Sequence, residues 1–140
     1  MEQRTDTATL PRSAVAMATY NGEAYLKEQV DSILSQTCSD FELQISDDAS
    51  TDGTLAILEA YSAKDPRVHV HVNEKNIGYR ANFYKAISMC SADLIFLSDQ
   101  DDRWLPHKME TLLRKIGDKM LVFSDSAITD SSGNNTGKKL

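Results

Sequence analysis

Residues 41–64 read FELQISDDASTDGTLAILEAYSAK and join a strand, a turn and a helix in one short stretch. The apolar residues of 41–46 favour a buried strand, and the Asp, Ser and Thr residues that follow are typical of turns and helix caps. Leu55, Leu58 and Tyr61 then recur at helical spacing. A strand that passes through a polar turn into a helix is the unit from which α/β proteins are built.

The same alternation extends in both directions from this stretch. Strands are predicted at residues 13–18, 41–46, 68–72, 94–98 and 120–123. Helices are predicted at residues 24–37, 54–64 and 79–89, and in a segment that has Pro106 in its first turn. Asn21 and Glu23 are expected to mark the start of the first helix. The pattern predicts the α/β class, with a mostly parallel sheet between two layers of helices.

A length of 140 residues suits one domain with a single core. We expect that domain at residues 13–130, after a flexible segment 1–12 and before a loose segment 131–140 that is rich in Ser, Asn and Gly. No run of about 18 apolar residues is present. Cys38 and Cys90 form no CxxC pair, which argues against zinc and for reduced thiols in a cytoplasmic chain.

The net charge of −6 and the lack of a long basic run argue against binding to nucleic acid, whose phosphates require clustered Lys and Arg. An acidic protein that handles phosphates usually needs a cation to do so.

Polar clusters follow three of the predicted strands, at residues 19–21, 47–48 and 99–102. In parallel sheets, ligands bind beyond the carboxyl ends of the strands. Because all three clusters lie there, the sequence predicts one binding site built from them.

Asp99, Asp101 and Asp102 are candidate ligands of a hard divalent cation, Mg²⁺ or Mn²⁺, because no His or Cys is nearby. An EF-hand loop is excluded, since Trp104 stands where such a loop needs glycine. The alternative is a solvated strand end with a helix cap, although a cap requires only one Asp.

Other polar residues also allow either a structural or a functional interpretation. Asp47 and Asp48 either cap the next helix or contact a base or ribose. His69 and His71 share one strand face, which is compatible with a metal site but more typical of a solvated or helix-covered surface. Arg80 is either a surface charge or a contact to a phosphate or base.

Several motifs, in this order and spacing, resemble the nucleotide-binding half of the family 2 glycosyltransferases across roughly residues 13–130. They are TYNGEAYLKEQVDSILSQT at 19–37, ISDDASTDGT at 45–54, DPRV at 65–68, NIGYRANF at 76–83 and FLSDQDDRWLPHK at 96–108. The variants MATYNGE and FLSDQDD look most like the bacterial rhamnosyltransferase branch.

The resemblance implies a GT-A fold, like that of nucleotide-diphospho-sugar transferases, and an inverting transfer of a hexosyl or rhamnosyl group to a polysaccharide or lipid-linked acceptor. It also implies the site. The residues that bind the nucleotide sugar would be Thr19, Tyr20, Asn21, Glu23, Asp47, Asp48, Arg80, Asp99 and Asp101. The ligands of the Mn²⁺ or Mg²⁺ would be Asp101 and Asp102.

The resemblance further implies a dTDP- or UDP-sugar as donor and a general base in the later, acceptor-binding half. We therefore expect these 140 residues to bind the donor without transferring the sugar. Asp125 and Asp130, the nearest candidates for a base, are more typical of turns. We expect a location in the cytoplasm or at the inner face of the membrane, and self-association through a face that the later half would cover.

The chain departs from the family pattern at two positions, where Ala18 replaces a frequent Pro and Ala49 replaces a frequent Gly. If that Gly usually has a positive φ, we expect the turn after Asp48 to differ.

Two other functions stay open. A sugar nucleotidyltransferase would normally show a Gly-rich, Arg-containing loop after the first strand, which TYNGEAYL lacks. A noncatalytic nucleotide-binding module is the second, and its receiver-domain version fits the DxDD cluster poorly.

Overall fold

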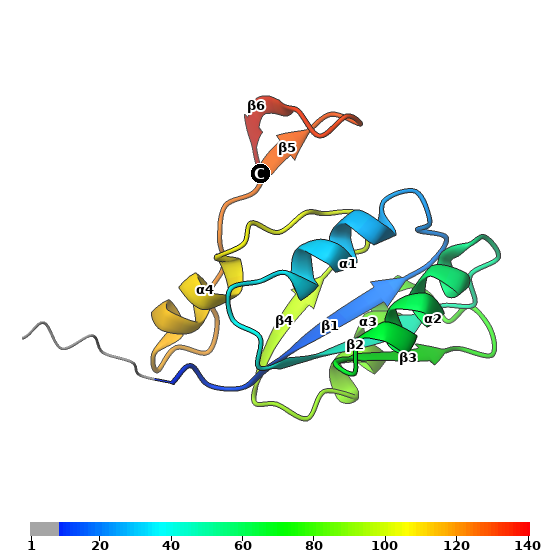
Figure 1. Ribbon diagram of the computed structural model, residues 1–140, viewed down its shortest axis with the longest axis horizontal. Coiled ribbons are helices and arrows are strands. Elements are labelled where there is room, and N and C mark those ends of the chain that lie inside the picture. The colour runs from blue at the N-terminus through cyan, green and yellow to red at the C-terminus, as the bar shows by residue number, and fades with distance from the viewer. Residues whose placement is uncertain (1–8) are drawn as a thin grey trace, which may run out of the picture.

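The computed structural model describes residues 9–140 of the chain (Figure 1). The strands are β1 (Ser13–Thr19), β2 (Phe41–Asp47), β3 (Val68–Val72), β4 (Leu94–Ser98), β5 (Ala127–Thr129) and β6 (Asn135–Lys139). The helices are α1 (Leu26–Leu34), α2 (Thr54–Lys64), α3 (Tyr79–Ser88) and α4 (Lys108–Ile116). Most of the segment that we expected to be flexible, 1–12, lies outside the described residues.

The first four strands form one parallel sheet in the order β3-β2-β1-β4. Ser13 at the start of β1 pairs with Phe41 of β2 on one side and with Leu94 of β4 on the other. Parallel neighbours cannot be joined by a tight turn, so a helix or a long connection carries the chain back between strands. The predicted α/β class with a mostly parallel sheet is confirmed.

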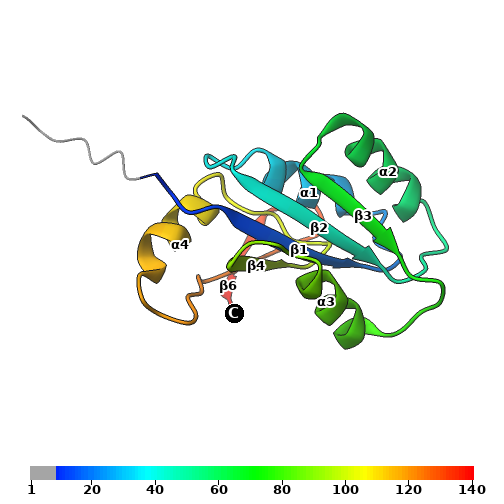
Figure 2. The same ribbon diagram turned by 90° about the horizontal axis from the view of Figure 1, so that it is seen from below.

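Helices cover both faces of the sheet, with α1 and α2 on one face and α3 on the other (Figure 2). The side chains of β1 alternate between these faces. Val15 and Met17 lie in the apolar core beneath α1 and α2, whereas Ala14 and Ala16 on the opposite face are small enough for α3 to pack closely. The core under α1 and α2 contains Val15, Met17, Leu26, Val30, Ile33, Phe41, Leu43, Ile45, Leu58, Val68, Trp104 and Met109.

The side chain of Gln36 fixes α4 to the carboxyl end of α1. Its Nε2 donates to the Leu105 carbonyl over 2.7 Å, and its Oε1 accepts the Met109 N–H over 2.9 Å. Met109 and Trp104 are buried against the core, and the Lys108 ammonium lies 4.6 Å from the centre of the Trp104 ring. The connection that carries the acidic residues after β4 is therefore fixed at its far end.

The predicted strand at residues 120–123 is wrong. These residues have no regular structure, and Met120, Leu121 and Phe123 are largely exposed. The apolar pattern indicated burial, but a strand also needs a partner for its N–H and C=O groups. No described residue pairs with this segment, so the parallel sheet has four strands within residues 9–140.

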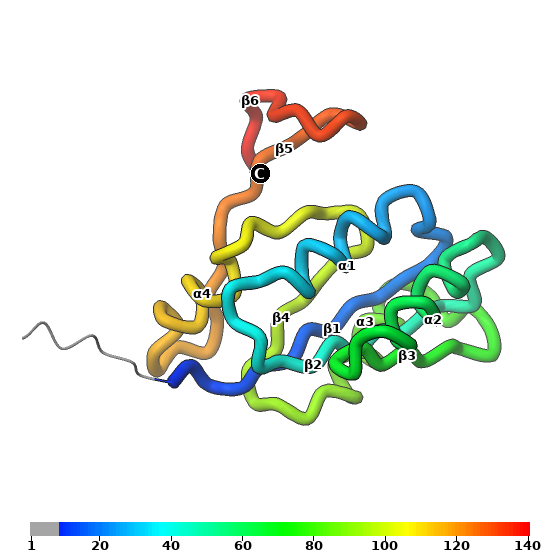
Figure 3. Tube along the Cα trace, viewed as in Figure 1, coloured from blue at the N-terminus to red at the C-terminus, as the bar shows by residue number. Residues whose placement is uncertain are grey.

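A two-stranded antiparallel hairpin of β5 and β6 follows instead and projects away from the sheet (Figure 3). Asp130 lies in its turn, where Oδ1 accepts the N–H groups of Ser132 and Asn134 over 2.9 Å each. Asp130 is thus a turn residue, as its type predicted. The segment 131–140, which we expected to be loose, differs from that expectation because β6 pairs with β5.

The outer strand β4 is partly uncovered. Ile95 and Leu97 are 37% and 60% exposed, on the face of the strand opposite to Phe96, which packs against Trp104. Self-association through this apolar surface stays a prediction. None of the helices in residues 9–140 has the length and apolar character that crossing a membrane requires.

Candidate functional site

The carboxyl ends of β1, β2 and β4 meet at one edge of the sheet. Thr19 is paired with Asp47, and Met17 is paired with Ser98, the residue that precedes the acidic cluster. The three polar clusters therefore lie at a common edge, as the parallel arrangement predicted. This register brings residues distant in sequence into one candidate site.

Asp47 joins β1 to the turn after β2. Its Oδ1 accepts hydrogen bonds from the hydroxyl groups of Thr19, over 2.8 Å, and Ser50, over 2.6 Å. Its Oδ2 accepts the Ser50 N–H over 2.9 Å. The carboxylate is fully buried, and these three donors compensate its charge.

Asp48 fixes the loop that precedes α3. Its Oδ1 accepts the Asn73 amide over 2.9 Å and the Ile77 N–H over 2.8 Å, and its Oδ2 accepts the Gly78 N–H over 2.9 Å. Gly78 has a φ of 91°, which glycine adopts readily. A carboxylate has about four acceptor positions, so the hydrogen bonds named here occupy about three of the four on Asp47 and on Asp48.

Asn21 and Glu23 do not cap the first helix, which corrects our expectation for them. The helix α1 begins at Leu26 without a side-chain cap. Asn21 Oδ1 instead accepts the N–H groups of Thr51 and Asp52, over 2.8 and 3.3 Å, and the Glu23 carboxylate accepts the Gly53 N–H. Both side chains satisfy backbone donors at the start of α2, because the β1–α1 loop lies beside that helix end.

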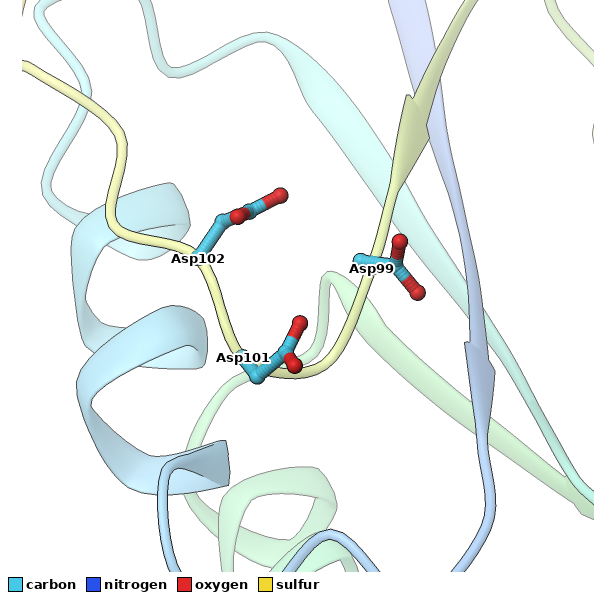
Figure 4. Close-up of side chains that lie close together, drawn as sticks. All are labelled: Asp99, Asp101 and Asp102. Atoms are coloured by element: carbon cyan, nitrogen blue, oxygen red, sulfur yellow. The ribbon is translucent and has the colours of Figure 1, made fainter. Parts of the chain in front are cut away.

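Asp99, Asp101 and Asp102 lie close together on the loop after β4 (Figure 4). One carboxylate oxygen from each lies within 4.8 Å of those of the other two. Partial burial, together with the negative charges of Asp101 and Asp102, raises the pKa of Asp99. The three carboxylates thus place like charges close together.

This donor set fits a hard divalent cation. Three carboxylates from one short loop can supply several oxygen ligands, and Mg²⁺ and Mn²⁺ bind through a few carboxylates while keeping positions for water or substrate phosphate. All three side chains are exposed, so a ligand can reach them. A cation would relieve the repulsion that raises the pKa of Asp99.

Tyr20 and Arg80, the remaining predicted binding residues, have exposed side chains. Tyr20 follows β1 at the edge where the clusters meet, and its backbone contacts the acidic loop through Gln100. Arg80 lies in the first turn of α3, two residues after the Gly78 held by Asp48. Both side chains are free to contact a ligand.

Asn82 is a buried residue of the site that the motif reading missed. Its Nδ2 donates to the carbonyl groups of Ser46, over 2.8 Å, and Thr19, over 3.3 Å, while its Oδ1 accepts the Asn73 amide over 3.0 Å. It therefore holds the ends of β1 and β2 together from α3. In the sequence, Asn82 lies between Phe83 and Ala81 and four residues before Ala86, which is the only local signal that it faces the sheet.

The turn after β2 retains a left-handed residue despite the departure at position 49. Ala49 has a φ of 60°, a conformation that costs a residue with Cβ roughly 1–2 kcal/mol. Ala49 therefore adopts the left-handed conformation that glycine adopts readily, and the expected difference of this turn from that of the family stays a prediction. The bonds that Asp47 makes to Ser50 help to hold the turn.

Comparison with known proteins identifies the family. A family described as glycosyl transferase family 2 matches residues 14–140. The dTDP-rhamnosyl transferase RfbG of Shigella flexneri is 39% identical over 102 residues, which cover 69% of this chain and 35% of that protein. The chain spans less than half the length of the curated relatives it matches.

Solved structures agree with this assignment. The structure of S. aureus TarS in complex with UDP-GlcNAc has 29% identity and a TM-score of 0.70, covering 75% of this chain and 31% of that one. Mannosyltransferase PcManGT from Pyrobaculum calidifontis, in complex with GDP-Man and Mn²⁺, has 22% identity and a TM-score of 0.70, and covers 81% of this chain and 34% of its own. At 22% identity, the similarity to PcManGT supports the assignment of the fold alone. The fold is GT-A, and the chain belongs to glycosyl transferase family 2.

Proposed function

We propose that this chain binds a nucleotide-diphospho-sugar together with Mg²⁺ or Mn²⁺ and forms the donor-binding part of an inverting glycosyltransferase. The observation that carries the proposal is the convergence of Asp99, Asp101 and Asp102 beside the ends of β1 and β2. A relative named for transfer from a dTDP-sugar and a solved structure in complex with UDP-GlcNAc support the donor class. Family membership favours this function over a sugar nucleotidyltransferase or a receiver domain.

The proposed roles follow the arrangement of the side chains. Asp101 and Asp102 hold the cation, and Asp99 contacts the ribose or the cation from the end of β4. One remaining acceptor position on Asp47 or Asp48 receives a hydrogen bond from the base. Tyr20 and Arg80, whose side chains are exposed, contact the nucleoside and a phosphate.

Thr19, Asn21 and Glu23 contribute mainly by holding the loops that line the nucleoside. They make the site rigid before the ligand arrives, which reduces the entropy lost on binding.

The reaction would be displacement at the anomeric carbon of the sugar, with the nucleoside diphosphate as leaving group. The cation, when bound, would stabilise the negative charge on the diphosphate. An inverting transfer also needs a general base that takes the proton of the acceptor hydroxyl. We assign that role to no residue of this chain, because Asp130 holds a turn and Asp125 pairs with Lys139 over 3.6 Å.

The preferred donor is a dTDP- or UDP-sugar, and the acceptor is a glycan or a lipid-linked glycan. A lipid-linked acceptor would place the protein in the cytoplasm or at the inner face of the membrane.

A thermal-shift panel of UDP-, dTDP- and GDP-sugars, each with Mn²⁺ and with EDTA, tests the proposal. A ligand at a hundredfold excess over its dissociation constant stabilises the folded chain by about 2.7 kcal/mol. The expected result is one nucleotide class that raises the melting temperature in Mn²⁺ and much less in EDTA. A uniform lack of response to all three classes would overturn the proposed function.

A further inference from the structure

Gln100, the residue between two members of the acidic cluster, contacts the loop after β1. Its Oε1 accepts the Tyr20 N–H over 2.8 Å, and its Nε2 donates to the Tyr20 carbonyl over 3.0 Å. The side-chain amide thus makes both hydrogen bonds that a paired strand residue would make. Residues 80 positions apart in the sequence are joined by this pair of bonds.

Gly22 provides the space for this contact. A Cβ atom built on Gly22 would lie 2.3 Å from Gln100 Oε1 and 2.5 Å from Gln100 Cδ, far inside normal contact distance. Gly22 does not have a positive φ, so the backbone there does not require glycine. The Gln100 side chain is what a Cβ at position 22 would meet, so the absence of a side chain at Gly22 leaves the space that this contact occupies.

The same loop is attached to the β2–α2 turn on its other side. The Gly22 N–H donates to Thr54 Oγ1 over 2.9 Å, and the Asn21 N–H donates to Ser50 Oγ over 2.9 Å. Ser50 in turn donates to Asp47. The acidic loop, the β1–α1 loop and the β2–α2 turn therefore form one hydrogen-bonded series with Gln100 at its start.

We propose that Gln100 is a positioning residue that couples cation binding at the acidic cluster to the conformation of residues 20–22, where the proposed function places the nucleoside. The coupling has a physical basis in the position of Gln100 between Asp99 and Asp101. A cation that draws these carboxylates together fixes the backbone on both sides of Gln100 and so strengthens its two bonds to Tyr20. The inference rests on the proposed function for its biological meaning, although the contact itself does not.

Amide hydrogen exchange at Tyr20 tests the contact without any ligand. The Tyr20 N–H donates to Gln100 Oε1, and the residue itself is 46% exposed, so we expect this bond to protect the amide. Gln100→Leu should speed the exchange of this amide by about tenfold or more. Gln100→Glu should lose part of the protection, because one carboxylate oxygen still accepts the Tyr20 N–H whereas the other cannot donate to the Tyr20 carbonyl. Gly22→Ala should also remove the protection of the Tyr20 amide, although residue 100 is still Gln, because the new Cβ atom displaces the flexible Gln100 side chain.

Arg103→Gln is the matched control. It lies in the same loop and breaks an exposed ion pair with Glu28, of 3.3 Å, but touches neither Tyr20 nor Gln100. Exchange at amides of β1 and β2 confirms that each variant is folded. Equal exchange at Tyr20 in the parent chain and in both Gln100→Leu and Gly22→Ala would overturn the contact.

Addition of Mg²⁺ alone tests the coupling. Binding is followed by the fluorescence of Trp104, the single tryptophan of the chain, and exchange at Tyr20 is measured in parallel. In the parent chain and in Arg103→Gln, Mg²⁺ should slow exchange at Tyr20 by about fivefold or more, and in Gln100→Leu it should have no effect there. Unchanged exchange at Tyr20 in the parent chain at any Mg²⁺ concentration would overturn the coupling. If a nucleotide sugar still raises the melting temperature in that case, the proposed function stands and only the coupling through Gln100 fails. Failure of the coupling can therefore be told apart from failure of the proposed function.

Discussion

The hydroxyl group of Thr19 donates a 2.8 Å hydrogen bond to Asp47, the residue paired with it across β1 and β2. Both side chains are buried at the point where the two strands end. This bond supplies one of the three donors that compensate the buried Asp47 charge.

Thr19→Val should lower the free energy of unfolding by about 1.5–3 kcal/mol, because it leaves a buried carboxylate short of a donor. Denaturant unfolding measures the change. Thr37→Val is a matched control, since Thr37 donates to Glu110 over 2.7 Å at an exposed position. That variant should change stability by less than about 1 kcal/mol. Equal losses in the two variants would contradict the importance of burial at Thr19.

Asp102→Asn should weaken binding of the nucleotide sugar by about tenfold or more in Mn²⁺ and change it little in EDTA, because it removes a charged cation ligand. Isothermal titration in both buffers provides the measurement. Asp93→Asn removes an exposed carboxylate just before β4 and serves as the control. An equal loss in Mn²⁺ and EDTA would assign Asp102 a structural role rather than a metal-binding one.

Asp65 gives the stability a defined dependence on pH. Its two oxygens accept hydrogen bonds from Arg67 over 2.8 and 3.0 Å, and these bonds lower the pKa of Asp65. Because the folded pKa lies below the unfolded value of about 3.9, the contribution is complete above that value and is lost as the pH falls through the folded pKa.

Asp65→Asn should therefore destabilise the chain by about 2 kcal/mol at pH 7 and by less at low pH. Urea unfolding of both chains from neutral pH to below about pH 4 measures the difference. A difference that stays constant over this range would show that the ionised Asp65 is not what Arg67 stabilises.

Ala49→Gly should stabilise the chain by about 0.5–1 kcal/mol, because glycine relieves the cost of the positive φ but adds freedom to the unfolded chain. Thermal unfolding is the measurement. Ala18→Gly, in the buried strand β1 and without a positive φ, should instead destabilise by a similar amount. Loss of stability in Ala49→Gly would mean that the turn does not hold Ala49 in the left-handed region.

Local pattern was enough to predict the four strands of the parallel sheet, because each is a short apolar or alternating run bounded by turn residues. It was enough to place Asp47, Asp48 and the acidic triad at one edge, because parallel strands align their carboxyl ends. The local pattern could not predict that Asn21 and Glu23 accept the backbone N–H groups before α2. A capping residue in a loop is chemically suited to whichever helix end lies nearby.

The same limit explains two other misses. The apolar residues at 120–123 resemble a strand, but the presence of a pairing partner is a property of the tertiary structure. Gln100 lies between two acidic residues, and the sequence gives no sign that its side chain packs against the β1–α1 loop. The contact of Gln100 with Gly22 and Tyr20 is a property of the tertiary structure.

The arrangement of the core also bears on how the chain is made. Its members run from Val15 to Met109, and β4, the last strand of the sheet in sequence, is one of its two outer strands. Domains fold as units during synthesis, starting from the N-terminal side. We expect this unit to resist protease on stalled ribosomes once Met109 has left the exit tunnel, and to remain sensitive when synthesis stops before β4. The strand that completes the sheet at the ribosome is then one of its two outer strands, and its free edge is presented to whatever the chain meets next.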